Sequence, residues 1–189
     1  MAMRGKKITQ SWGPSRGNKP VKSTLRRGGT RPSLPVYLMF NKPDGVLTQF
    51  RPVAGKKTLS DFGPFPRDVH PVGRLDEDSE GLLLLTNDGL LHHLLIEPKF
   101  GHPRTYLVQI ERIPDPSALE KLRSGVTIGE DPTLPAEARL LPVDPGLWPR
   151  GTPIRFRKSV PTAWIEITLR EGRNRQVRKM TAAVGHPAL

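Results

Sequence analysis

From residue 36 onward, the hydrophobic positions of the chain fall into short runs separated by glycine, proline, asparagine and aspartate. Runs of this length are typical of β-strands when they alternate with polar residues or end at turn residues. The pattern predicts strands over 36–40, 46–50, 82–86, 105–110, 136–143 and 163–169. We expect the second strand to return beside the first, and the leucine-rich third strand to be buried and closed by a turn.

Two segments have the features of helices instead. Asp115 is suited to cap a helix that begins at Pro116, and Gly125 is suited to end it, so the sequence predicts a helix over 116–124. A second, basic helix is expected over 174–184. Its apolar face is formed by residues at helical spacing: Val177, Met180, Thr181 and Val184.

Strands outnumber helices in this pattern, and neither a strand-helix-strand alternation nor an internal repeat is present. We therefore expect an α+β domain built on a mainly antiparallel sheet with flanking helices. Residues 1–35 have a different composition, with nine basic residues, no acidic residue and almost no large apolar ones. The sequence predicts that 1–35 is a disordered basic tail that contacts phosphates, and that 36–189 is the folded domain.

The composition excludes several classes of protein. The chain has 189 residues and no cysteine, so a disulfide scaffold, cysteine-ligated zinc and a thiol nucleophile are ruled out. No run approaches the roughly 18 apolar residues of a membrane span, and the N-terminus lacks the apolar core of a signal peptide. We expect a cytoplasmic protein with no membrane partner.

The charge points to a polyanionic partner. Thirty Lys and Arg against 18 Asp and Glu give a net charge of +12, which makes RNA or DNA the expected partner. An anionic membrane surface is the weaker alternative, because no segment has the pattern of a long basic amphipathic helix. The histidines lack metal-ligand spacing and the glycine-rich stretches match no nucleotide-binding motif, so we expect no metal and no cofactor.

Four carboxylates lie within five positions just before the leucine-rich strand. One interpretation is a solvated acidic turn that neutralises the basic surface around it. A calcium loop fits Asp76, Asp78, Glu80 and Gly81, but Asn87 stands where a bidentate glutamate is needed and no amphipathic helix precedes the segment. A third interpretation is a catalytic carboxylate.

Asp76 is the strongest candidate for that carboxylate, because it follows an apolar residue at the mouth of a strand. A partly desolvated carboxylate stays ionised only with a cationic partner nearby. Helical geometry places Arg178 on the flank of the apolar face of 174–184, where it can be half-buried, while Arg175 and Lys179 point into solvent.

These residues match a known pattern. The segment 73–89, Gly-Arg-Leu-Asp-x-x-Ser-x-Gly followed by Leu-Leu-Leu-Leu-Thr-Asn-Asp-Gly, resembles the signature of the RNA pseudouridine synthases, in the branch of small proteins that modify ribosomal RNA. Further segments agree in order: Asn-Lys-Pro-x-Gly at 41–45, Arg-Thr-Tyr-Leu-Val at 104–108, and Glu-Gly-Arg-Asn-Arg-Gln-Val-Arg-Lys-Met at 171–180. The run Arg-Lys-Ser-x-Pro-Thr at 157–162 is similar to members that act on the large subunit.

The resemblance implies a pseudouridine synthase fold with a central active-site cleft, and an enzyme that isomerises a specific uridine in 23S ribosomal RNA without metal or cofactor. Asp76 is then the catalytic aspartate, nucleophilic or base-like, and Arg178 pairs with it. Tyr106 stacks on the flipped base and helps to deprotonate C5. By residue type alone, a tyrosine such as Tyr106 in an alternating strand is more often a core or interface residue, and a helix arginine such as Arg178 is more often solvated.

The resemblance also implies a set of RNA-binding cations: Lys42, Arg74, Arg104, Arg173, Arg175 and Lys179. Position 104 usually holds lysine in the family, and the arginine keeps the charge. Relatives continue beyond the position of Leu189 into an Arg- and Leu-rich segment, so we expect the catalytic domain to be incomplete at its C-terminal end. We also expect the protein to be a monomer. The alternative is a non-catalytic basic protein that binds ribosomal RNA during ribosome assembly.

Overall fold

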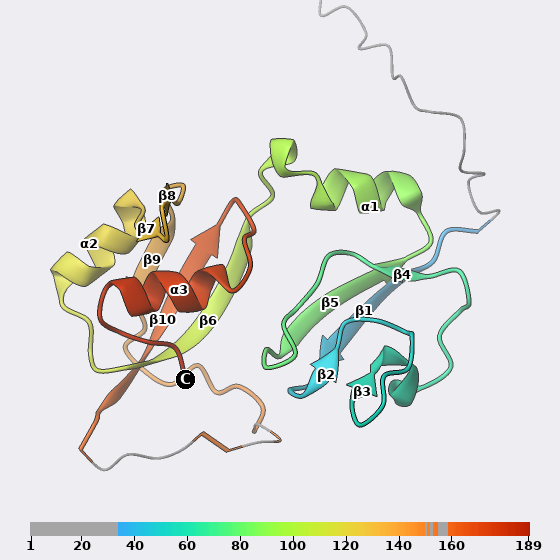
Figure 1. Cartoon of the computed structure of the whole chain (residues 1–189), viewed down its shortest axis with the longest axis horizontal. Helices are drawn as coiled ribbons and strands as arrows, with labels where there is room; N and C mark the ends of the chain where they lie inside the picture. The colour runs from blue at the N-terminus through green and yellow to red at the C-terminus, as the bar shows by residue number, and fades with distance from the viewer. Residues whose placement is uncertain (1–33, 150, 152, 155–158) are drawn as a thin grey trace, which may run out of the picture. The chain divides into compact units, whose positions relative to one another are not determined.

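The computed structural model describes residues 34–149, 151, 153–154 and 159–189. These residues belong to one unit, whose described part runs from Leu34 to Leu189 (Figure 1). The predicted basic tail lies outside the described residues except for Leu34 and Pro35. Within the described ranges, no helix is both long enough and apolar enough to cross a membrane.

The first half of the unit is built on a three-stranded antiparallel sheet. Its order is β1 (Tyr37–Lys42), β5 (Gly81–Thr86) and β4 (His70–Pro71). In the register of β1 and β5, Tyr37 faces Thr86 and Lys42 faces Gly81. The sheet therefore brings the Asn-Lys-Pro-x-Gly turn beside the acidic segment that precedes β5.

The predicted hairpin between 36–40 and 46–50 is wrong. β2 (Val46–Leu47) pairs in parallel with β3 (Lys57–Thr58), which leads into a short 3-10 helix (Leu59–Phe62). β1 pairs with β5 instead of β2, and the backbone N–H of Gly45 donates to the carbonyl of Glu77 at 2.8 Å. The turn is directed toward the acidic segment and does not fold back on β1.

The leucine run forms the predicted strand, but only alternate residues are buried. Leu83 and Leu85 lie in the core with Val46, Leu59 and Val69, whereas Leu82 is 64% exposed. This alternation is typical of a sheet with one face packed on a core.

The expected turn after this strand is instead the start of a helix. The carboxylate of Asp88 accepts hydrogen bonds from the N–H groups of Leu90 and Leu91, and so caps α1 (Gly89–Ile96). A short 3-10 helix (Pro98–Phe100) leads from α1 toward the second half of the unit.

The second half contains another three-stranded antiparallel sheet. Its order is β6 (Arg104–Glu111), β10 (Thr162–Leu169) and β9 (Glu137–Leu140), and a small hairpin is formed by β7 (Thr127–Ile128) and β8 (Asp131–Pro132). The strands predicted over 105–110 and 163–169 are confirmed. The strand predicted over 136–143 is shorter, since Pro142 has no N–H to continue the ladder.

Two helices belong to this half and contribute to its core. α2 (Pro116–Ser124) has the predicted boundaries, with the carboxylate of Asp115 accepting from the N–H of Ala118 at 2.7 Å. α3 (Gln176–Ala183) buries Met180, which packs in one hydrophobic cluster with Ile165 and Ile167 of β10. The molecule is thus an α+β protein with mainly antiparallel pairing, as predicted, although its strands form separate sheets.

Candidate active site

The acidic segment is a loop that ends at Gly81 and is fastened at both sides by backbone contacts. The hydroxyl of Thr48 donates to the carbonyl of Leu75 at 2.8 Å and accepts from its N–H at 3.2 Å. The N–H of Ser79 donates to the carbonyl of Asp76 at 3.1 Å. These bonds fix the backbone on either side of Asp76, so the carboxylate projects from a defined position.

Lys42 lies beneath this loop and has no exposed surface. Its ammonium donates to the carbonyls of Pro43 at 2.9 Å and Glu77 at 3.3 Å. Burial lowers the pKa of Lys42, while nearby carboxylates, Asp44 foremost, oppose that shift. Lys42, predicted to bind RNA, does not present its ammonium at the surface of this structure: it supports the loop from inside, through a contact 35 positions away along the chain.

Asp76 presents a lightly coordinated carboxylate. Its side chain is 37% exposed, and the nearest cation is the guanidinium of Arg175, whose Nη1 lies 3.9 Å from Oδ2. That distance is too long for a hydrogen bond. The carboxylate thus has a positive charge close by, and its oxygens remain accessible.

Asp78, two positions further on, is held much more tightly. Its two oxygens accept hydrogen bonds from Nη1 and Nη2 of Arg175 at 2.8 and 2.7 Å. Nη2 of Arg178 donates to the backbone carbonyl of Asp78 at 3.0 Å and lies 3.5 Å from its carboxylate. The hydrogen bonds from Arg175 lower the pKa of Asp78 below its ordinary value.

Two predictions about α3 are corrected by these contacts. The ion pair expected between Arg178 and Asp76 is not formed among the described residues, since Arg178 binds Asp78 instead. Arg175 does not point into solvent. It is the N-cap residue of α3 in a left-handed conformation, with φ of 52°, so regular helical geometry does not apply to it.

Tyr106 projects from β6 and packs against the hydrophobic cluster of the second half. Burial raises the pKa of its hydroxyl, the charge of Arg104 opposes this, and the charge of Asp76 adds to it. The charge of Asp76, 30 positions earlier in the sequence, therefore acts on the Tyr106 hydroxyl.

The remaining predicted RNA-binding cations differ in how freely they are presented. Arg74 and Lys179 are exposed. Arg104 is half-buried and donates to the carbonyl of Leu95 at 3.4 Å. Arg173 is occupied by structural contacts, because it binds Glu171 at 3.1 Å and the carbonyl of Pro132 at 2.7 Å.

Glu171 and Gln176 form hydrogen bonds that fix the segment before α3, a role that was not predicted from the sequence for either residue. The carboxylate of Glu171 accepts from the N–H of Leu134 at 2.8 Å and from Nε2 of Gln176 at 2.7 Å. The side-chain oxygen of Gln176 accepts in turn from the N–H of Arg173 at 2.9 Å. Burial favours a higher pKa for Glu171, but these hydrogen bonds and Arg173 leave it lowered. Both residues lie in the motif at 171–180, which marks the segment but does not indicate these individual contacts.

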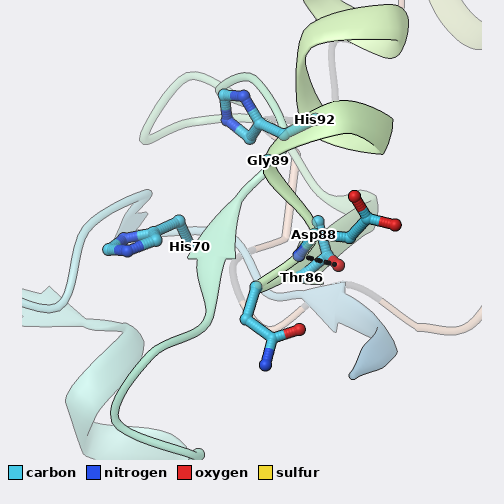
Figure 2. Close-up of a pocket in the computed structure, with 6 residues that line it drawn as sticks. His70, Thr86, Asp88, Gly89 and His92 are labelled. Atoms are coloured by element: carbon cyan, nitrogen blue, oxygen red, sulfur yellow. Dashed lines mark hydrogen bonds between the residues drawn. The ribbon is translucent and has the colours of Figure 1, made fainter. Parts of the chain in front are cut away.

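A separate hollow of about 190 Å³ lies where β4 and β5 meet the start of α1, and its lining includes His70, Thr86, Asp88 and His92 (Figure 2). Figure 2 shows the hydrogen bond from the N–H of Asp88 to the hydroxyl of Thr86, which is 3.0 Å long. None of the acidic loop lines this hollow. In the part of the chain that the structure describes, no group of histidines and carboxylates is arranged to hold a metal ion.

Comparisons with known proteins match this arrangement to one family. The profile described as RNA pseudouridylate synthase matches residues 36–183. A protein of Xanthomonas axonopodis pv. citri (strain 306), named ribosomal large subunit pseudouridine synthase E, is 54% identical over 156 residues, which is 82% of each chain. A protein of the same name from Vibrio vulnificus (strain CMCP6) is 51% identical over 152 residues, covering 80% of this chain and 64% of that one.

A solved structure agrees with the sequence comparisons. The crystal structure of a pseudouridylate synthase superposes with a TM-score of 0.65 at 29% identity, covering 82% of this chain and 60% of the other. The present chain thus spans less than two thirds of the length of that protein and of the Vibrio relative.

Proposed function

The chain belongs to the RNA pseudouridylate synthase family, and from this membership we propose that it isomerises uridine to pseudouridine in large-subunit ribosomal RNA, with Asp76 as the catalytic group. The family match extends over 36–183, which supports a catalytic domain that begins near residue 36. The observation that carries the assignment of Asp76 is its environment. It is the carboxylate of the acidic loop that has a cation nearby and yet no hydrogen bond from the described residues to its oxygens.

The reaction transfers the uracil ring from one attachment to another on the same ribose. The C1′–N1 bond breaks and its electron pair leaves with the base, the base turns, and a C5–C1′ bond forms with loss of the C5 proton and protonation of N1. Asp76 serves as the nucleophile that displaces the base, as carboxylates do at the anomeric carbon in retaining glycosidases, or as a base-like group in the same position. Substrate and product have the same atoms, so we propose that no cofactor or metal takes part.

Tyr106 receives the flipped base in this proposal. Extrusion of a uridine from a helix costs a few kcal/mol, and stacking on an aromatic ring offsets about 1–3 kcal/mol of it. The ring is held by the hydrophobic cluster of the second half, and Asp76 is close enough to influence its hydroxyl. We propose that the Tyr106 hydroxyl, for which the described residues provide no hydrogen-bond partner, relays the C5 proton: its raised pKa keeps it neutral, so it releases its own proton to solvent as it accepts the proton of C5.

RNA binding is assigned to the cations that remain available. Arg74 and Lys179 are exposed, and we propose that they contact phosphates together with the nine basic residues of 1–35. Arg104, Arg173 and Arg175 already have protein partners, so their contribution to RNA binding requires those contacts to be shared or exchanged.

The direct test uses the purified protein and a transcript of large-subunit ribosomal RNA. After incubation and digestion, nucleosides are separated and pseudouridine is quantified by mass spectrometry after chemical labelling. We expect pseudouridine to form at a discrete site with wild-type protein and not with Asp76→Asn. Formation of none by the wild-type protein, with RNA binding intact, favours the alternative of a non-catalytic ribosome assembly factor.

A further inference from the structure

Arg175 occupies a position that is unfavourable without a partner. A positive charge at a helix N-terminus is opposed by the helix dipole, and a left-handed conformation in a residue other than glycine is sparsely populated. Arg175 combines both features at the start of α3, with φ of 52°. Its bidentate bonds to Asp78, at 2.8 and 2.7 Å, are the contacts that offset these costs.

Asp78 also binds the second guanidinium of α3. Arg178 reaches both its backbone carbonyl, at 3.0 Å, and its carboxylate, at 3.5 Å. One residue of the acidic loop therefore gathers two cations from a helix that lies about a hundred positions later in the chain. Of these two cations, Arg175 comes within 4 Å of the carboxylate of Asp76.

We propose that Asp78 is a positioning residue for the isomerisation: its carboxylate binds Arg175 and Arg178 and so holds them beside Asp76 without letting either form a direct hydrogen bond to it. This inference rests on the proposed function, because it concerns how the carboxylate of Asp76 is kept reactive. Asp78 thus has a positioning role, which differs from the catalytic role proposed for Asp76.

Asp78 affects Asp76 in two ways: it sets the distance between Arg175 and Asp76, and it competes with Asp76 for the guanidinium of Arg175. At 3.9 Å, Arg175 supplies a positive charge while the lone pairs of Asp76 remain open to the ribose carbon. Without the carboxylate of Asp78, the same guanidinium is free to make a bidentate pair with Asp76, which occupies the oxygens that must react. A released guanidinium is also free to bind an RNA phosphate, which strengthens binding rather than weakening it.

The opposite interpretation is that the ion pair only fastens α3 to the loop. A brace of that kind affects the unfolding transition, but it leaves the turnover of the folded protein unchanged. The two interpretations therefore differ in kcat and in the salt dependence of RNA binding.

The test measures steady-state pseudouridine formation on a large-subunit ribosomal RNA transcript by wild-type protein, Asp78→Asn and Glu130→Gln. The control removes one negative charge from an exposed carboxylate in the turn between β7 and β8, which has no hydrogen bond or ion pair to the described residues. We expect Asp78→Asn to lower kcat by at least about tenfold, in the range caused by misplacing a catalytic group. The KM for RNA should stay constant or fall, and the slope of log K against log salt should steepen by about 0.7 to 0.9.

The control should keep kcat within about twofold of wild type, as expected for a surface charge away from the reacting atoms. An Asp78→Asn protein that keeps the wild-type kcat beside an active wild-type enzyme overturns the positioning role and leaves the proposed function standing. A wild-type protein that forms no pseudouridine overturns both. If Asp78→Asn does not fold, Asp78→Glu keeps the charge but moves it outward by one methylene, and the same loss of kcat is expected of it.

Discussion

The two halves of the folded unit hold their functional groups by different means. In the first half, the loop that carries Asp76 is fixed by polar contacts from Thr48, Lys42 and Gly45 to its backbone. In the second half, Tyr106 and α3 are anchored in a hydrophobic cluster of nine buried residues, against five in the first half. The carboxylates thus come from a hydrogen-bonded loop, and the aromatic ring and the guanidiniums come from a packed core.

This difference separates effects on chemistry from effects on folding. The polar contacts of the first half position a few backbone atoms, so their loss should change turnover more than global stability. The apolar contacts of the second half contribute in proportion to buried area, so their loss should appear first in the free energy of unfolding.

The largest effect is expected from Asp76, the proposed reacting group. Asp76→Asn should lower kcat by roughly a thousandfold or more, because an amide of the same shape is neither a nucleophile nor a base. The carboxylate is partly exposed and contributes no hydrogen bond to the described residues, so folding and RNA affinity should be nearly unchanged. Single-turnover assays and gel-shift titrations measure the two quantities. A variant that keeps a tenth of the wild-type rate shows that another group performs the chemistry.

In the packed half, Ile165→Ala should lower the free energy of unfolding by about 2–5 kcal/mol, because its side chain is 0% exposed in the cluster with Met180. Ile113→Ala is a matched control, since Ile113 is 62% exposed and should change stability by less than about 0.5 kcal/mol. Urea unfolding followed by circular dichroism measures both. Equal losses in the two variants contradict the assignment of this core.

The aromatic ring of the same half is expected to affect turnover. Tyr106→Ala should lower kcat/KM by roughly 5- to 150-fold, which corresponds to the loss of about 1–3 kcal/mol of base stacking. Tyr106→Phe keeps the ring and isolates the contribution of the hydroxyl to the C5 proton transfer. Two variants of equal rate, both slower than wild type, would assign the whole effect to the hydroxyl and remove the stacking role.

Thr48→Val tests whether hydrogen bonds to the loop backbone position Asp76. The side chain is of similar size, but the hydroxyl that bonds both the N–H and the carbonyl of Leu75 is lost, at a cost of about 1–3 kcal/mol. We expect kcat to fall even at temperatures where the variant is fully folded, because the backbone beside Asp76 loosens. Thr105→Val, at an exposed position of β6, is the control. A Thr48→Val protein with wild-type kcat contradicts the idea that hydrogen bonds position the nucleophile.

The smallest effect concerns the pH dependence of stability. The folded-state pKa of Asp78 lies below its ordinary value of 3.8, so the charged form contributes stability above that pH. The contribution is lost as pH falls through the lower, folded pKa. Because 45% of the side chain is exposed, we expect no more than about 1 kcal/mol. The measurement compares wild type and Asp78→Asn by urea unfolding between pH 2 and 7, and a difference that does not shrink at low pH counts against the pair.

The sequence correctly predicted elements whose ends are set by residues close by in the chain. The helix over 116–124 was predicted with its observed boundaries, because its aspartate cap, its first proline and its terminal glycine act within one turn. The hairpin at 46–50 was wrong, because the partner of β1 lies about 40 positions further along the chain and no local rule identifies it.

The candidate site also contains residues that the sequence predicted and contacts that it could not predict. The motifs singled out Asp76 and Tyr106, and in the structure the charge of Asp76 acts on the Tyr106 hydroxyl. The sequence could not reveal that Lys42 is buried, or that Arg175 and Arg178 bind Asp78, because these contacts join residues 35 to 100 positions apart.

The central claim is that this chain forms pseudouridine in large-subunit ribosomal RNA through Asp76. The most direct measurement maps pseudouridine at nucleotide resolution in ribosomal RNA from cells that lack the protein, and from the same cells supplied with wild type or Asp76→Asn. The account predicts that a large-subunit site loses its modification, that wild-type protein restores it, and that the aspartate variant does not. Unchanged modification in cells that lack the protein, or restoration by Asp76→Asn, would contradict it.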